Sequence, residues 1–180
     1  MMRLLSKHVH CVLRFATKLP GFCSLPHDDQ ITMVNNGVFQ IVMVVLANFC
    51  DKTEIINNYL FMTEDEIQKV MMVFPEIGIL NSCMKSCKEA LSLLKLDDVE
   101  YALLNALQLI STDWPELTSR APIENLQDKL CLALEEYCSG KRSAGYDQFG
   151  MILLVIRRLQ HVADIYHNCL RQLRHKIPHV

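Results

Sequence analysis

The residues best suited to chemistry are eight cysteines, seven histidines and several adjacent pairs of acids. Cys83 and Cys87 would share one helix face, but two thiols do not complete a zinc site, and no third ligand stands nearby at finger-like spacing. Neighbouring acids such as Asp97 and Asp98 point about 100° apart on a helix and make poor acid–base partners. We therefore expect ordinary thiols, no metal site and no acid–base pair.

Longer catalytic motifs are also missing. The chain has no phosphate-binding glycine loop, no His-Glu-x-x-His motif, no serine elbow and no dinucleotide fingerprint. We predict that the protein is not an enzyme but a binding or interaction module. A formal charge of −2 argues against direct contact with nucleic acid. Several cysteines lie in apolar runs with no secretory signal before them, which indicates a reducing compartment: Cys11, Cys50, Cys131 and Cys169.

Composition predicts one mostly helical domain. The chain has 180 residues, 51% of them apolar, and only six Gly and six Pro, which disfavours turn-rich β folds. The uncharged stretch 30–50 is long enough to cross a bilayer, but Asn35, Asn36, Gln40 and Asn48 interrupt it. We expect a helix buried inside a globular core, with no membrane contact.

Start and stop signals divide the chain into helices. Pro20-Gly21 ends the first, capping boxes at Thr63 and Asp97 open two others, and Asn57-Asn58 marks the turn of a small β-hairpin. The expected helices cover about 4–19, a segment from 27, 38–49, 63–75, 78–93, 99–110, 122–139 and 146–174, with the hairpin at 53–62.

A run of residues at fixed spacing joins the first two helices: Phe15-Ala16-Thr17-Lys18-Leu19-Pro20-Gly21-Phe22, then Leu25, Asp29-Gln30 and Met33-Val34. This run resembles the signature of nuclear receptor ligand-binding domains. The similarity is to the thyroid-hormone-receptor-like group, nearest to the Rev-erb and retinoid-related orphan receptors. It extends over about 12–173 through the segments 37–44, 109–115, 123–130 and 153–159.

The resemblance implies an all-α, three-layer antiparallel helical sandwich with at most one small β-hairpin. Residues 1–180 would form a single, partial ligand-binding domain, truncated at both ends and without the family's DNA-binding zinc module. Such a domain acts in the nucleus, in transcription regulation. It binds a coregulator and a lipophilic small molecule such as a sterol or a fatty acid.

The resemblance also implies two sites. An apolar pocket for the ligand would be lined by Val9, Val12, Met43, Ala47, Cys50, Leu60, Phe61, Tyr166 and Leu170. A groove for a coregulator helix would be lined by Leu13, Thr17, Gln30, Ile31, Val34 and Asn35.

Departures from the family pattern shape these expectations. Thr17 and Asn35 replace the two lysines that flank the groove, and the C-terminal activation helix is missing, which favours a corepressor-type helix held by apolar contacts over a coactivator. Gln40 and Trp114 replace an ion pair associated with heterodimers, so the partner in a receptor dimer through the 146–174 helix is left open. Tyr166 stands where the family has His, which argues against haem.

Two alternatives stay open. The chain could be a ligand-independent dimerisation or dominant-negative module, in which side chains fill the space between Val12, Met43 and Tyr166. It could instead be a mitochondrial helical protein, because residues 1–27 contain basic but no acidic side chains, as a presequence does. In that case the mature chain would start near His27.

Overall fold

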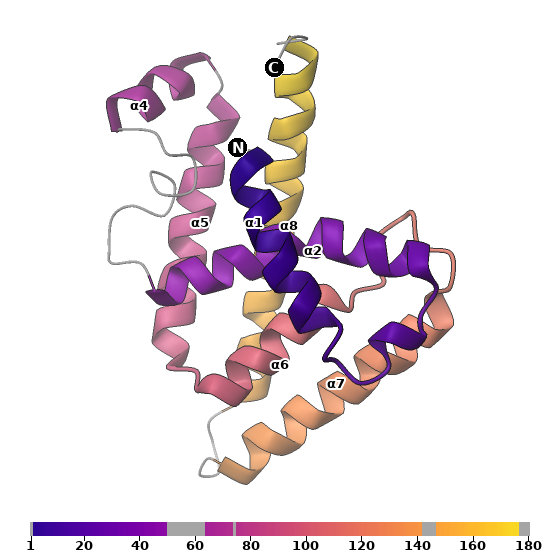
Figure 1. Cartoon of the computed structure of the whole chain (residues 1–180). Coiled ribbons are helices and arrows are strands. Elements are labelled where there is room, and N and C mark those ends of the chain that lie inside the picture. The colour runs from indigo at the N-terminus through magenta and orange to yellow at the C-terminus, as the bar shows by residue number, and fades with distance from the viewer. Residues whose placement is uncertain (1, 50–63, 74, 142–146, 177–180) are drawn as a thin grey trace.

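The structure, a computed structural model, describes residues 2–49, 64–73, 75–141 and 147–176, and every element in this part of the chain is a helix (Figure 1). The all-α prediction is confirmed, while the hairpin expected at 53–62 lies outside the described residues. The helices are α1 (Met2–Ala16), the short 3₁₀ helix η1 (Phe22–Ser24), α2 (His27–Phe49), α4 (Glu64–Val73), α5 (Pro75–Leu94), α6 (Asp98–Leu109), α7 (Arg120–Lys141) and α8 (Gln148–Lys176).

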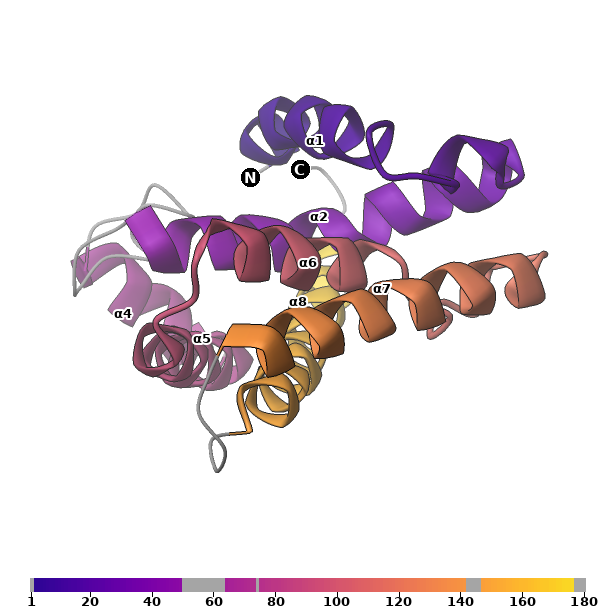
Figure 2. The same ribbon diagram turned by 90° about the horizontal axis from the view of Figure 1, so that it is seen from below.

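The helices stack in three layers (Figure 2). Helix α1 packs on α2, and α2 and α6 pack together in the middle. Helices α5 and α8 pack against each other on the far side of α2, and α7 runs beneath α6 in contact with α8. One core of apolar side chains connects all three layers. The predicted helical sandwich is thus confirmed.

Helix α2 is the buried rod at the centre of the sandwich. All residues from Gly37 to Val44 are buried, as the apolar run predicts. The helix continues through Gly37, where a β-carbon would stand 3.2 Å from Leu109 Cδ1 and 3.4 Å from Leu109 Cα. The glycine therefore lets α2 approach α6 closely instead of ending a helix. None of the described helices has the length and apolarity of a membrane-spanning segment.

Helix ends differ from the predictions by up to three residues. Helix α1 ends at Ala16, because the next amides form tighter i→i−3 bonds: Lys18 N donates to Phe15 O and Leu19 N to Ala16 O, both at 3.0 Å. Gly21 then turns the chain with a φ of 90°. Helix α5 begins at Pro75 and not at Gly78, since proline needs no amide partner in the first turn.

Asp97 forms the predicted capping box at the start of α6. Its carboxylate accepts a bond from the Glu100 N–H, and Glu100 accepts one from the Asp97 N–H, each at 2.9 Å. The same carboxylate accepts a bond from the Tyr137 hydroxyl (3.0 Å) and pairs with Lys141. Asp97 thus joins the start of α6 to the end of α7, which stabilises the lower edge of the sandwich.

The described cysteines carry free thiols, but not all of them lie in the core. Cys169 is buried and Cys131 half-buried, as expected of small apolar side chains. Cys11 is exposed, against the prediction, because α1 is an outer helix of the sandwich and leaves part of its surface in solvent. Cys50 lies outside the described residues.

Candidate coregulator groove and ligand pocket

The six residues expected to line a groove lie at the meeting of α1 and α2. Leu13 is on the last turn of α1, Thr17 directly after it, and the other four are on the first half of α2. Leu13 is 42% exposed and Ile31 45% exposed, whereas Val34 is buried in the core between the two helices. We call the surface of the six expected groove residues the trough; Leu13 and Ile31 are its exposed aliphatic side chains, on two helices that pack against each other, and Val34 is buried.

The polar residues of the trough carry no charge. The Thr17 hydroxyl donates to the Arg14 carbonyl (3.2 Å), and the Gln30 amide nitrogen donates to the Leu25 carbonyl (2.8 Å). Asn35 is exposed. These local bonds hold Thr17 and Gln30 in place, so the trough offers mainly apolar contact to a partner.

Asp29 ties the first turn of α2 to the segment before α7. The carboxylate is fully buried and accepts bonds from the Thr118 N–H (2.8 Å), the Thr118 hydroxyl (3.0 Å) and the Ser119 N–H (3.0 Å). The Thr118 N–H is the largest cause that lowers the pKa of Asp29, although burial acts in the opposite direction. The sequence predicted only a favourable acid at a helix start. The partners lie 89 and 90 residues away, and no local signal points to them.

The loop between α6 and α7 is held from two sides. The Ser111 hydroxyl and the Gln160 amide of α8 both donate to Asp113 Oδ2, at 3.0 and 2.8 Å. Arg120 donates to the carbonyls of Thr112 and Trp114.

Gln40, which stands in place of one half of the family's ion pair, is buried, and neither of its amide atoms has a partner among the described residues.

The residues expected to line the ligand pocket divide into two groups. Val12, Met43 and Tyr166 are only 1–3% exposed, so their side chains are buried among neighbouring residues. The Tyr166 ring stacks on Phe39 of α2, with centroids 4.0 Å apart and planes 9° from parallel. Val9 and Leu170 are half-buried, and Ala47 lies at the border of the core. Cys50, Leu60 and Phe61 lie outside the described residues.

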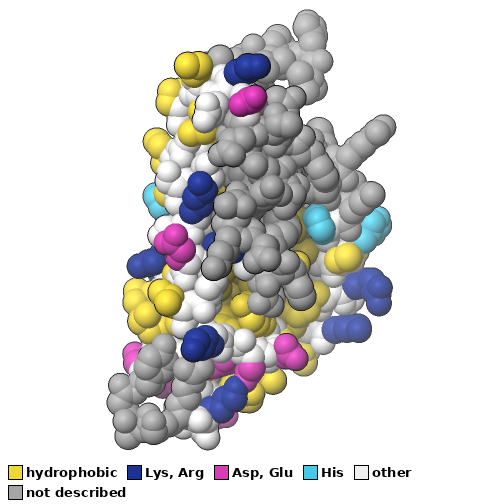
Figure 3. Space-filling model, turned by 90° about the vertical axis from the view of Figure 1, so that its left-hand side faces the viewer, with side chains coloured by type: hydrophobic (Ala, Val, Ile, Leu, Met, Phe, Trp, Pro, Cys, Tyr) yellow, Lys and Arg dark blue, Asp and Glu magenta, His cyan; other side chains and the backbone are white. Residues whose placement is uncertain are grey.

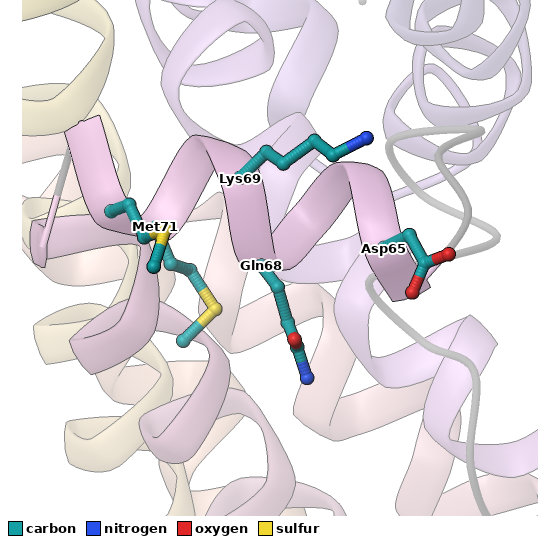
Figure 4. A pocket seen from close by; sticks show the side chains of 5 residues that line it. Asp65, Gln68, Lys69 and Met71 are labelled. Carbon is teal, nitrogen blue, oxygen red and sulfur yellow. The ribbon is translucent and has the colours of Figure 1, made fainter.

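A cavity of about 440 Å³ lies on α4, and none of the described residues that line it belongs to either expected site. Its wall is formed by Asp65, Gln68, Lys69, Met71 and Met72. Lys69 and Gln68 leave opposite sides of the helix, and Asp65 points away from Met71 (Figure 4). The described polar groups that line this cavity do not converge, as those of a ligand site would.

The surface on the α4 and α5 side mixes apolar, basic and acidic side chains and shows no single charged field (Figure 3). Single exposed apolar side chains on α5, such as Ile79 and Leu93, are ordinary on a protein surface. In the part of the chain that the structure describes, no three His, Cys, Asp or Glu residues come together as a metal site would require.

Comparison with known proteins identifies the family of this chain. Residues 1–174 match the model for the ligand-binding domain of nuclear hormone receptor. Nuclear receptor subfamily 1 group I member 3 from Macaca mulatta is 30% identical over 165 residues, which cover 88% of this chain and 46% of that protein. Thyroid hormone receptor beta from Ovis aries is 30% identical over 145 residues (79% and 34%), and that from Danio rerio 31% over 143 residues (78% and 35%).

The chain spans less than half the length of these relatives. They agree with the predicted thyroid-hormone-receptor-like group. The match covers α1 through nearly all of α8, the helices that build the three layers. The chain therefore belongs to the nuclear hormone receptor ligand-binding domain family.

Proposed function

We propose that this chain, as a single domain, acts in the nucleus in transcription regulation by binding an amphipathic helix of a coregulator in the trough. The observation that carries the proposal is the exposure of Leu13 and Ile31 on two helices that pack against each other. Aliphatic side chains placed this way lose unfavourable contact with water when a partner helix covers them.

The chemistry of the trough favours a corepressor-type helix. Thr17 and Asn35 are neutral, so neither can hold the end of a partner helix by charge, and affinity must come from apolar contact along the helix. Helix α8 adds a second surface for a partner, because Met151 and Leu154 are exposed on it. We assign that surface to a receptor dimer.

The test uses a fluorescein-labelled amphipathic peptide of about five helical turns, with Leu and Ile along one face. We expect saturable binding by fluorescence anisotropy, and at least about tenfold weaker binding to Leu13→Glu and Ile31→Glu, since each variant places a charge against apolar side chains. Leu93→Glu is the matched control, because Leu93 is 78% exposed on α5, away from the trough. Equal affinity for all four proteins would contradict the proposal.

A second candidate function is favoured by the Phe39–Tyr166 stack. Two buried rings that stack between α2 and α8 support a domain that works without a bound ligand, as a dimerisation or dominant-negative module. We expect the purified protein to show only its own mass in native mass spectrometry and to unfold cooperatively. A co-purified sterol, fatty acid or haem would instead support the lipophilic-ligand function of the family.

A further inference from the structure

A hollow of about 390 Å³ lies between α5 and α8. Cys83 and Cys87 line it from α5, and Leu154 and Val162 line it from α8. These residues belong neither to the trough nor to the expected pocket. The volume lies at the small end of the range that ligand sites occupy, about 300–1,000 Å³.

Cys87, Leu154 and Val162 form an uncharged part of the wall of this hollow. Burial raises the pKa of the Cys87 thiol to about 11, so the thiol stays protonated at neutral pH. Val162 is buried, and Leu154 leaves more than half of its side chain in solvent. The hollow therefore presents apolar surface that a hydrocarbon chain can cover.

The rim of the hollow is basic. Arg157 and Arg158 of α8 line it, together with His161, and none of the described residues that line it is an Asp or a Glu. Arg157 makes one long bond, from Nη1 to the Gln160 side-chain oxygen at 3.4 Å. Neither arginine forms an ion pair within the residues that the structure describes. Their guanidinium groups thus keep donors for an anion, and carboxylates fit the guanidinium fork well.

We propose that the hollow between α5 and α8 binds a small organic anion with an apolar body, of the class of medium-chain carboxylates. The carboxylate pairs with Arg157 and Arg158 at the rim. The alkyl chain covers Leu154, Val162 and the Cys87 side chain. This site shares no residue with the trough, so either of these two proposals can fail without the other. It shares Leu154 with the α8 surface assigned to a receptor dimer, so the test is made on the monomer.

The test titrates octanoate into ¹⁵N-labelled protein, at a concentration at which analytical ultracentrifugation shows a monomer. We expect saturable shifts of amide signals confined to 83–87 and 154–162. Octylammonium, with the same chain length and the opposite charge, should give no saturable shift. Shifts from both compounds, or shifts centred on α1 and α2, would overturn the proposal.

Variants distinguish the contribution of the arginine charges to octanoate binding from the contribution of the apolar wall. The double change Arg157→Gln and Arg158→Gln should weaken octanoate binding roughly tenfold, because the charge-assisted bonds are lost. Ser86→Trp, at an exposed residue that also lines the hollow, should fill it and abolish binding. Arg171→Gln, at an exposed arginine farther along α8, is the matched control. Unchanged affinity in folded Arg157/Arg158 and Ser86 variants would refute the site.

Discussion

Replacing Asp29 by alanine is expected to lower the free energy of unfolding by about 3 kcal/mol. The change removes a buried carboxylate and leaves the N–H groups of Thr118 and Ser119 without their acceptor. Urea unfolding followed by circular dichroism measures the difference. Asp28→Ala is the matched control: Asp28 is the neighbouring acid in the same first turn, but it is exposed, so the expected effect is only about 0.5 kcal/mol.

The effect of Asp29 depends on pH in a defined direction. Its pKa is lowered in the folded state, so its contribution is complete above the unfolded pKa of about 3.9 and is lost as pH falls through the folded value. The stability difference between the native protein and Asp29→Asn, which cannot titrate, should therefore be constant near neutral pH and shrink below about pH 4. A difference that stays constant through acid pH would mean that the carboxylate charge does not contribute.

Replacing Tyr166 by alanine is expected to lower the free energy of unfolding by about 4 kcal/mol, because a buried ring is lost and its space beside Phe39 is left empty. Tyr166→Phe keeps the ring and should retain most of the stability. Thermal unfolding measures both changes. If the alanine variant does not fold, Tyr166→Leu replaces it, and its expected loss of stability is smaller but in the same direction.

The same variant tests whether the interior is filled. An apolar compound the size of benzene should raise the melting temperature of Tyr166→Ala by occupying the new space, and should leave the native protein unchanged. Equal stabilisation of both proteins would show that a space already exists in the native interior. The filled-core candidate would then be wrong.

The sequence predicted features that depend on neighbouring residues. The capping box at Asp97 follows from a spacing of three residues, and the buried rod of α2 follows from an uninterrupted apolar run. Most helix ends shifted, because single bonds such as Leu19 N to Ala16 O decide the last turn and the pattern of residue types does not encode them.

Long-range pairings could not be predicted. Nothing around Asp29 indicates Thr118, and nothing around Phe39 indicates that Tyr166 stacks on it, because each pairing depends on how distant helices are placed. Gly37 was expected at a helix boundary, since its close approach to Leu109 becomes visible only when α6 is in place. The trough residues follow from family resemblance alone, because no local sequence pattern distinguishes Leu13 from other exposed leucines.

The bonds of Asp29 also bear on the thermodynamics of recognition. These bonds fix the position of the first turns of α2, which carry Gln30 and Ile31. This part of the trough therefore has little conformational freedom to lose when a helix docks. The entropic penalty of association then falls mostly on the incoming peptide. Differences in affinity among peptides with the same apolar face should follow their intrinsic tendency to be helical in solution.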